Sequence, residues 1–455
     1  MDGTGKRKCR CAELEAEVEE LRQKNAVLTE QLEEAQRAGK RQTSRFNRNK
    51  RAENPKKPGR KSGSKPSHRD KPDKIDRTVD VTLDGHACPD CGCEMDVTRH
   101  SQFQTDIPPV QPTTTQFDVE VGTCPCCGKR IQARHPDQTS DALGAANHTI
   151  GPNLHGMAAS LKHNSGMSFA KVSAFFHEWF HIKSAPSTFV RSLYRIAKKA
   201  MPTFSQLRDQ LHRGLRIHAD ETGWRVGTRS CWLWVFCNDD VTLFDIAGRD
   251  QGVAKAMLGD FNNVLCTDGY QAYNPLELLK QRCNGHVQKR IKDLQSRLID
   301  AASQHSLNII SSLFKTAQAL LGRRESMPDN MYRDELFRLE KCFDDWLWLS
   351  EESKQPELLK LRRHLLKHRP EWFQYLYQPG LPATNNLAER QIRPGVITRK
   401  LGGCNKSWRG ALTTRIVASL AATCRQQGRQ FGELIRHLLH AREPTAISIA
   451  AMPPI

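Results

Sequence analysis

Near the N-terminus, apolar residues recur at alternating spacings of four and three. Between residues 11 and 38 the positions in this pattern are Leu14, Val18, Leu21, Asn25, Leu28, Leu32 and Ala35. Such spacing is typical of the seam of a coiled coil, and the amide of Asn25 would favour one paired register. We therefore predict a coiled coil over residues 1–39 that joins copies of the chain. The alternative is a single amphipathic helix that lies on its own protein.

Beyond residue 145 the apolar pattern is first helical and then alternating. Residues 146–212 contain SFAKVSAFFHEWF and STFVRSLYRIAKKAM, two helical stretches separated by a short turn. They predict either a helix-turn-helix that faces duplex DNA or a plain two-helix hairpin. From residue 213, LRIHADETGWRV, CWLWVFCN and VTLFDIAG predict an antiparallel meander, whereas NVLCTDGY predicts a buried parallel strand.

The charge of the chain favours a polyanionic partner. The 455 residues include 69 Lys or Arg and 50 Asp or Glu, which gives a formal net charge of +19. Nucleic acid is the first candidate for such a partner, and an anionic membrane is the second. No apolar run reaches eighteen residues, and the N-terminus lacks the apolar core of a signal peptide. We therefore expect no membrane span and a cytoplasmic protein.

The length and composition also predict several domains. A chain of 455 residues is too long for one compact core and should form two to four domains. Residues 40–75 are rich in Lys, Arg, Pro and Gly and almost free of apolar residues. Such a segment cannot fold by burial, so we predict a disordered basic linker that either contacts phosphates or only tethers its neighbours.

Two CxxC motifs predict a zinc-binding module over residues 76–145. The tetrahedral coordination of zinc calls for four soft ligands, and the predicted set is Cys88, Cys91, Cys124 and Cys127. Cys93 and Cys126 lie close enough in sequence for either to replace a neighbour as a ligand. The alternative is a pair of redox motifs, but no thioredoxin-like βαβ pattern surrounds them.

Two aspartates fall on predicted strands of the same region. Asp220 alternates with apolar residues in LRIHADETGW, and Asp268 follows the apolar strand of NVLCTDGY. Adjacent strands can bring these carboxylates side by side, where they repel each other unless a cation lies between them. The pair therefore implies a divalent ion, and Mg²⁺ prefers a few carboxylates together with water. Glu221 would point to the opposite strand face, so we do not count it as a ligand.

Three motifs extend this acidic pair into a family resemblance. HADETGWRV, TDGYQAYN and TNNLAERQIRP, in this order, resemble the DDE motifs of bacterial insertion-sequence transposases of the IS sixty-six family. The heptad segment, the basic linker and the two-knuckle module also agree with the plan of that family. The resemblance implies that Asp220, Asp268 and Glu389 are the catalytic acids and the ligands of two ions, Mg²⁺ or Mn²⁺.

The resemblance also implies a fold of the α+β class. The catalytic domain would cover residues 213–425 as a ribonuclease-H-like mixed sheet flanked by helices, followed by a C-terminal helix and tail at 426–455. The gap of 121 residues between the second and third acids (389 minus 268) implies an all-α insertion. Residues 287–378, rich in Leu, Lys, Arg and Glu, would supply it.

Basic residues follow the third acid. Glu389 would lie on a helix with one of the two asparagines of TNNLAER near its N-terminus, where backbone amides can face a phosphate. Arg390 and Arg393 would then face DNA or hold the carboxylate in place. The alternative is an ordinary surface pair between Glu389 and Arg393.

Four further residues are candidates for smaller roles. Arg399 and Lys400, at the start of RKLGGCNKSWRG, predict a glycine-rich loop that either contacts phosphates or is simply solvated. Cys283 and His286 form a CxxH motif after the second acid, similar to a spacing in several DDE families. The pair would need two more ligands to hold zinc, so we favour a structural role close to the site.

These features lead to an expected function. The protein would be a transposase that cuts the ends of its own element and joins the 3′ hydroxyl to target DNA. Its partners would be double-stranded DNA with terminal inverted repeats, target DNA, further copies of itself and helper proteins of the same element. We expect it in the bacterial cytoplasm at the nucleoid. The alternative is a DNA-binding repressor or domesticated relative that has no catalytic activity.

Overall fold

The computed structural model describes residues 71–108, 110–144 and 150–455. The predicted coiled coil at 1–39 and most of the predicted linker at 40–75 lie outside the described residues. The chain divides into two compact units, of which one comprises residues 45–115 and the other contains Gln116–Ile455. In the described ranges, no helix combines the length and the apolar character needed to cross a membrane.

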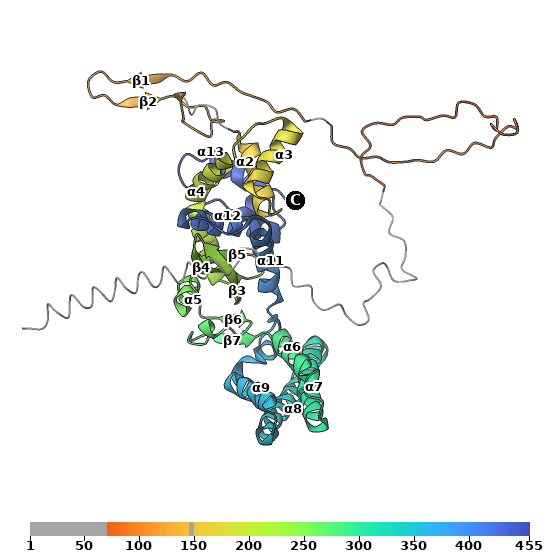
Figure 1. The fold of residues 1–455 in the computed structure, drawn as a ribbon, viewed down its shortest axis with the longest axis vertical. Coiled ribbons are helices and arrows are strands. Elements are labelled where there is room, and N and C mark those ends of the chain that lie inside the picture. Colours follow the sequence, from red (N-terminus) through yellow and green to blue (C-terminus); the bar gives the residue numbers. More distant parts are fainter. Residues whose placement is uncertain (1–70, 109, 145–149) are drawn as a thin grey trace, which may run out of the picture. The chain divides into compact units, whose positions relative to one another are not determined.

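The larger unit is built around a mixed five-stranded sheet (Figure 1). In spatial order its strands are β5 (Thr242–Ala247), β4 (Arg229–Cys237), β3 (Arg216–Val226), β6 (Val264–Thr267) and β7 (Leu279–Arg282). Strands β3, β4 and β5 form the predicted antiparallel meander. Strand β6 is parallel to β3, as predicted, and β7 is parallel to β6. The fold therefore mixes helices with a mixed sheet, which is compatible with the predicted α+β class.

Helices surround this sheet in three groups. Ahead of it come α2 (Pro152–His163), α3 (Phe169–Phe180) and α4 (Pro186–His212). Between β5 and β6 lies α5 (Gln251–Leu258). After the insertion come α11 (Asn386–Gly402), α12 (Trp408–Gln426) and α13 (Phe431–His440). The two helical stretches predicted within residues 146–212 correspond to α3 and α4.

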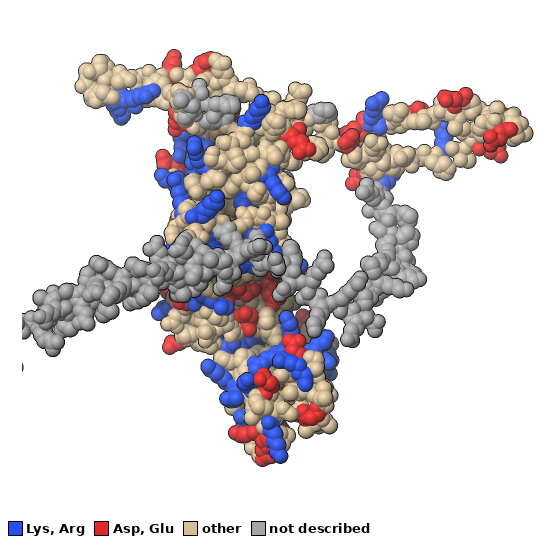
Figure 2. Space-filling model, viewed as in Figure 1, with Lys and Arg blue, Asp and Glu red and all other residues tan. Residues whose placement is uncertain are grey.

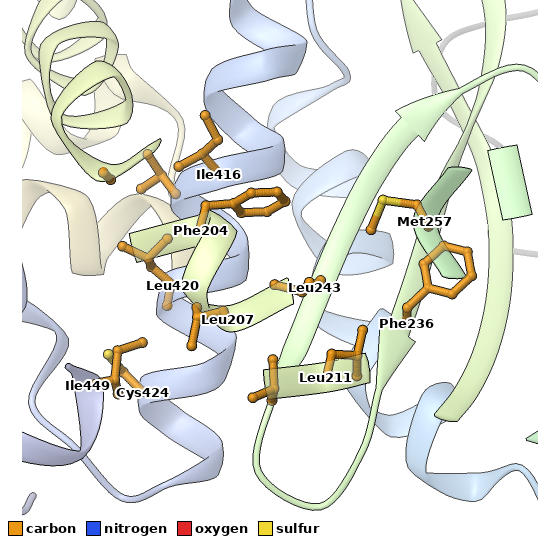
Figure 3. Close-up of a cluster of buried hydrophobic side chains, with 14 of the residues drawn as sticks. Phe204, Leu207, Leu211, Phe236, Leu243, Met257, Ile416, Leu420, Cys424 and Ile449 are labelled. Atoms are coloured by element: carbon orange, nitrogen blue, oxygen red, sulfur yellow. The ribbon is translucent and has the colours of Figure 1, made fainter. Parts of the chain in front are cut away.

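The alternation of side chains along β3 creates two separate cores, one on each face of the sheet. Ile217 and Ala219 point into a core shared with α4, α5 and α12, which Figure 3 shows in close-up. Trp224 and Val226 point to the other face, into a core covered by α11 and one side of α12. Asp220 pairs with Val235, which belongs to this second core, so Asp220 lies on the face covered by α11.

Both outer strands of the sheet have neighbours. On α12, the hydroxyl of Ser419 accepts a hydrogen bond from the backbone amide of Phe244, and Thr423 exchanges two with the backbone of Thr242. On the opposite side, the 3₁₀ helix η5 (Arg369–Glu371) and α10 (Gln374–Tyr377) lie against β7. On β5, side chains of α12 thus occupy the backbone groups of Thr242 and the amide of Phe244, which an edge strand would otherwise expose.

The stretch predicted as an all-α insertion is helical. Between β7 and α11 it contains α6 (Asn284–Gln295), α7 (Ala301–Arg323), α8 (Asp329–Leu349), α9 (Pro356–Lys367) and α10. Phe314, Phe343 and Trp372 lie in its core, which continues onto Val264 and Cys266 of β6. The insertion therefore packs on the sheet beside the strand that leads to Asp268.

Candidate active site

Strands β3 and β6 bring Asp220 and Asp268 side by side. The last paired residues of these parallel strands are Ala219 and Thr267, so Asp220 is the next residue of β3 and Asp268 directly follows the end of β6. Adjacent strands lie about 4.8 Å apart. Burial, followed by the negative charges of Asp268, Glu221 and Glu389, raises the pKa of Asp220 to about 7. The carboxylates are therefore close enough to repel one another.

Glu389 reaches the same site from the first turn of α11. The start of that helix is held by Asn385, which is buried and lies between the helix and the sheet. Its side-chain amide donates to the carbonyl of Ala219 at 2.7 Å, and its Oδ1 lies 3.0 Å from Nδ1 of His218. The sequence suggested a capping asparagine here. Asn385 does occupy the N-cap position, but its side chain bonds to β3 instead of to the helix.

The loop after Asp268 is held by a buried arginine. The Oδ1 of Asp268 accepts the backbone amide of Tyr270 at 2.9 Å. Between them Gly269 has a φ of +96°, and a Cβ there would clash with Nη1 of Arg282. That Nη1 donates to the carbonyl of Gly269 at 2.9 Å, and Nε of Arg282 pairs with Glu371 at 2.5 Å. Sequence patterns had not indicated Arg282.

Cys283 and His286 lie beside Glu389. The sulfur of Cys283, a ring nitrogen of His286 and a carboxylate oxygen of Glu389 lie within 4.8 Å of one another. Nδ1 of His286 is 3.8 Å from Oε1 of Glu389. The hydrogen bond with Cys283, and then the charges of Cys283, Glu389 and Asp268, outweigh burial and raise the pKa of His286 to about 9.

Cys283 itself is buried, and burial alone would raise the pKa of its thiol. Hydrogen bonds from His286 and from the backbone amide of Asn385, the latter at 3.2 Å, outweigh that effect and lower the pKa. The CxxH pair therefore links the start of α11 to the end of β7. These contacts support a positioning role for both residues.

Two basic residues, Arg390 and Arg393, follow Glu389 on α11. Arg390 and Arg393 are exposed on α11, and Figure 2 shows Lys and Arg around the acidic side chains near the middle of this face. In the part of the chain that the structure describes, Glu389 has its ion pair with His286, and no ion pair joins it to Arg393. The geometry thus gives no support to the alternative of a simple surface pair.

The predicted phosphate loop at Arg399 and Lys400 is wrong in one respect. Both residues belong to the last turn of α11, which continues to Gly402. Nη1 of Arg399 donates to the hydroxyl of Thr222 and to the carbonyl of Gly223, so its guanidinium is held on β3. The glycines that suggested a loop lie at the end of the helix instead.

Glu221 lies on the opposite face of β3 from Asp220, as the alternation of the strand predicted. Its side chain is only 2% exposed, and Oε1 is 3.0 Å from Nη2 of Arg249. The hydroxyl of Tyr273 donates to Oε2 at 3.4 Å. Arg249 in turn lies 4.0 Å from the ring centre of Tyr270. Glu221 therefore has a cationic partner supplied by the protein.

The four predicted zinc ligands fall in different units. Cys88 and Cys91 belong to residues 45–115, whereas Cys124 and Cys127 lie in the larger unit, at the turn between β1 (Val121–Thr123) and β2 (Arg130–Gln132). Backbone hydrogen bonds within each knuckle lower the pKa of Cys88 and of Cys124. Lower thiol pKa values favour the thiolates that zinc binds. The zinc site itself stays a prediction.

Comparison with known proteins places the chain in a family. One similar protein is the uncharacterized protein y4qI of Sinorhizobium fredii (strain NBRC 101917 / NGR234), 24% identical over 250 residues. The match covers 48% of this chain and 46% of y4qI, so the chain aligns with about half the length of that relative. The sequence model described as "Transposase IS66 family" matches residues 148–413, from α2 to the start of α12. Since that match spans more than half of the chain, the protein belongs to the IS66 transposase family.

Proposed function

We propose that this protein is a DDE transposase that cleaves DNA strands at the ends of an insertion sequence and joins them to target DNA. The observation that carries the proposal is the gathering of Asp220, Asp268 and Glu389 from three distant segments. In the described residues, no ion pair joins Asp220 or Asp268 to a basic side chain. Carboxylates that lie together without a cationic side chain are suited to bind metal ions.

The order of the strands supports a ribonuclease-H-like catalytic domain. An antiparallel meander, β5–β4–β3, is extended on its other side by the parallel strands β6 and β7. The two aspartates lie where the meander meets the parallel strands, and the third acid comes from a helix on the same face. The insertion at α6–α10 separates the second and third acids along the chain without separating them in space.

The donor atoms fit a hard divalent cation. All three acids offer oxygen, and burial together with the charges of the neighbouring acids raises the pKa of Asp220. We infer that Asp220, Asp268 and Glu389 hold two ions of Mg²⁺ or Mn²⁺. Such ions supply charge stabilisation at the phosphate and activation of the attacking oxygen. In the zinc-binding module, the proposed structural ligands are Cys88, Cys91, Cys124 and Cys127.

The other residues of the site would position the acids and the DNA. Asn385 fixes the start of α11 on β3, and Arg282 fixes the turn after Asp268. Arg390 and Arg393 are exposed beside Glu389 and would contact phosphates. Lys400 at the end of α11 would add a phosphate contact, whereas Arg399 is committed to β3.

The partners that follow from this function are double-stranded DNA at the terminal repeats, target DNA, further copies of the chain and helper proteins of the element. A cytoplasmic protein at the nucleoid fits such partners. A repressor or domesticated relative without catalysis is the competing function. The intact set of three acids in one site favours the transposase, because a repressor has no need to keep carboxylates together at a cost in stability.

The test uses the full chain with labelled DNA from the ends of its element, with and without Mg²⁺ or Mn²⁺. We expect metal-dependent nicking at the element ends and joined products with target DNA. The variant Asp268→Asn should bind the same DNA but give neither product. Specific binding by the wild-type chain with no cleavage under any of these conditions would favour the repressor.

A further inference from the structure

A thiol and an imidazole lie beside one of the three acids of the candidate active site. Cys283 is the N-cap residue of α6, and His286 lies in the first turn of the same helix. Glu389 lies in the first turn of α11. The sulfur of Cys283, a ring nitrogen of His286 and a carboxylate oxygen of Glu389 lie within 4.8 Å of one another. Two helix starts that are distant in sequence thus bring three different metal-ligating groups together.

The spacing of these three groups is close to that of a tetrahedral zinc site. Zinc binds sulfur at about 2.3 Å and nitrogen or oxygen at about 2.0–2.2 Å, which places its ligand atoms about 3.3–3.7 Å apart. Nδ1 of His286 is already 3.8 Å from Oε1 of Glu389, and both side chains are about half exposed. Cys283, in contrast, is buried. Small rotations of the two exposed side chains toward the sulfur would therefore bring all three atoms around one ion.

The sulfur of Cys283 is held in place by the hydrogen bonds around it. The backbone amide of Asn385 donates to this sulfur at 3.2 Å, and the side-chain amide of Asn385 donates to the carbonyl of Ala219 at 2.7 Å. The backbone amide of Asn284 donates to the carbonyl of Ala383 at 2.9 Å. The starts of α6 and α11 are thus fixed to each other and to β3. Hydrogen bonds of this kind orient a metal ligand before the ion arrives.

The three groups favour a different ion from the one that the three acids favour. Thiolate and imidazole are ligands of zinc, whereas Mg²⁺ prefers oxygen. The CxxH motif supplies two zinc ligands, and the fold adds Glu389 as the third. Three protein ligands leave the fourth position of a tetrahedron open, and the exposure of His286 and Glu389 lets water reach it.

We propose that Cys283, His286 and Glu389 form a Zn²⁺ site that competes with the proposed Mg²⁺ site for the carboxylate of Glu389. The zinc site depends on these three side chains alone, whereas the competition rests on the proposed function. A carboxylate bound to zinc attracts a second cation less strongly, so zinc weakens the binding of Mg²⁺. By linkage, Mg²⁺ weakens the binding of zinc by the same factor. Zinc is then an inhibitor of metal-dependent cleavage, and without zinc Cys283 and His286 position Glu389.

The test of the site measures Co²⁺ binding to the full-length protein by absorption spectroscopy. Cobalt bound to a thiolate gives a charge-transfer band, which a site made only of oxygen ligands does not give. The cysteines of the proposed zinc-binding module contribute equally to all variants, so the variants are compared with one another. Wild type should bind one more thiolate-coordinated Co²⁺ than Cys283→Ser, and added Zn²⁺ should abolish this extra signal. Cys342→Ser, at an exposed position of α8, is the matched control and should bind as wild type does.

A second variant covers the case in which Cys283→Ser fails to fold. His286→Ala changes a half-exposed side chain, and it should weaken the extra Co²⁺ site by about tenfold or more while circular dichroism stays unchanged. The zinc site would be overturned if wild type bound no more thiolate-coordinated Co²⁺ than Cys283→Ser. Wild-type affinity in folded His286→Ala would overturn it as well. Both results would leave cleavage by the three acids untouched.

The competition is measured on the same cobalt band. Saturating Mg²⁺ should weaken the extra Co²⁺ site of wild type by about fivefold or more. The effect should be much smaller in Asp268→Asn, which loses a proposed Mg²⁺ ligand that the zinc site does not use. Equal weakening in the two proteins would overturn the competition. A Co²⁺ site that Mg²⁺ does not affect, in a protein that also shows no metal-dependent cleavage, would overturn the proposed function and with it the competition.

Discussion

Asp220 and Glu221 are neighbours on β3, yet their carboxylates lie on opposite faces of the strand and have different kinds of neighbours. Glu221 points toward Arg249 and Tyr273, which supply a positive charge and a hydroxyl donor. Asp220 points toward Asp268 and Glu389, and burial, followed by the charges of neighbouring acids, raises its pKa to about 7. One face of the strand therefore pairs its acid with an arginine, whereas on the other face Glu389 pairs with His286 and, among the described residues, the two aspartates have no ion-pair partner.

A second acid near the site, Glu371, also has an arginine partner. Glu371 of the insertion meets the buried Arg282, so this acid also has an arginine, although it lies close to the turn that follows Asp268. Arginine is thus available near the site and is used for acids that hold the structure together. The difference teaches that the lack of an arginine at Asp220 and Asp268 is selective. Acids of that kind are the ones we expect to bind metal ions.

The largest expected effect is on catalysis. Asp220→Asn, Asp268→Asn and Glu389→Gln should each lower strand cleavage by about 10³-fold or more, since a lost ligand removes several kcal/mol of charge stabilisation. Binding of element-end DNA should change little. Glu221→Gln is the matched control and should retain cleavage within about tenfold. If folded Glu221→Gln lost both cleavage and metal binding, Glu221 would be as important to the site as Asp220, and the contrast between the two faces of β3 would be wrong.

The next largest effect is expected on stability, at the ion pair between Arg282 and Glu371. Arg282→Met should lower the free energy of unfolding by about 3–5 kcal/mol, because it leaves a partly buried carboxylate at Glu371 with only His368 beside it. The double variant with Glu371→Met should recover part of that loss. Urea denaturation of the three proteins measures both. A loss below about 1 kcal/mol for Arg282→Met would show that the pair is not a structural anchor.

Substitution of Asp220 should stabilise the chain, whereas substitution of Arg282 should destabilise it. Its carboxyl has a pKa of about 7 in the folded chain against 3.8 as the ordinary value, so the folded state keeps a proton that the unfolded state has lost. Without added divalent cations, stability should fall as pH rises from about 4 to 7. Asp220→Asn should remove this component and stabilise the chain at pH 8 by an amount on the order of a few kcal/mol. Melting temperatures at pH 5 and 8 provide the measurement, and a variant less stable than wild type at pH 8 would contradict it.

The smallest effect is expected at the exposed arginines of α11. Arg393→Ala should weaken DNA binding a few-fold and reduce the slope of log affinity against log salt by about one, as expected for one lost phosphate contact. Arg399→Ala should leave that slope unchanged, because its guanidinium is bonded to β3. Titrations at several salt concentrations separate the two. Equal changes of slope would mean that Arg399 also faces DNA.

The sequence predicted the strands that carry a regular pattern and missed the one that does not. Alternating or apolar runs located β3, β4, β5 and β6 to within a few residues. Strand β7 has the sequence LKQR and gives no such signal. Its polar side chains are buried because other groups receive them: Lys280 donates to the nearby carbonyl of Leu276, and Gln281 bonds to the distant backbone of Trp372 and Tyr375. Such partners are set by the tertiary fold.

The candidate site likewise contains residues that the sequence identified and residues whose roles it did not. The resemblance to a family named the three acids, and the fold brings them together. Asn385 was considered only as a cap, because its bonds to His218 and Ala219 span more than 160 positions of the chain. Arg399 was assigned to a loop because of the glycines that follow it, although the helix continues through Gly402. Local composition could not show which strand would accept its guanidinium.

The side chains that occupy the margins of the sheet also limit how copies of this protein can associate. Because Ser419 and Thr423 are bonded to the backbone of β5, a strand of a second copy would have to displace these side chains to extend the sheet at that side. If copies associate, contacts through other surfaces would leave this edge intact. Contacts of that kind can form and separate without disturbing the strands, so the acids on β3 and β6 would keep their spacing while the complex is assembled and taken apart.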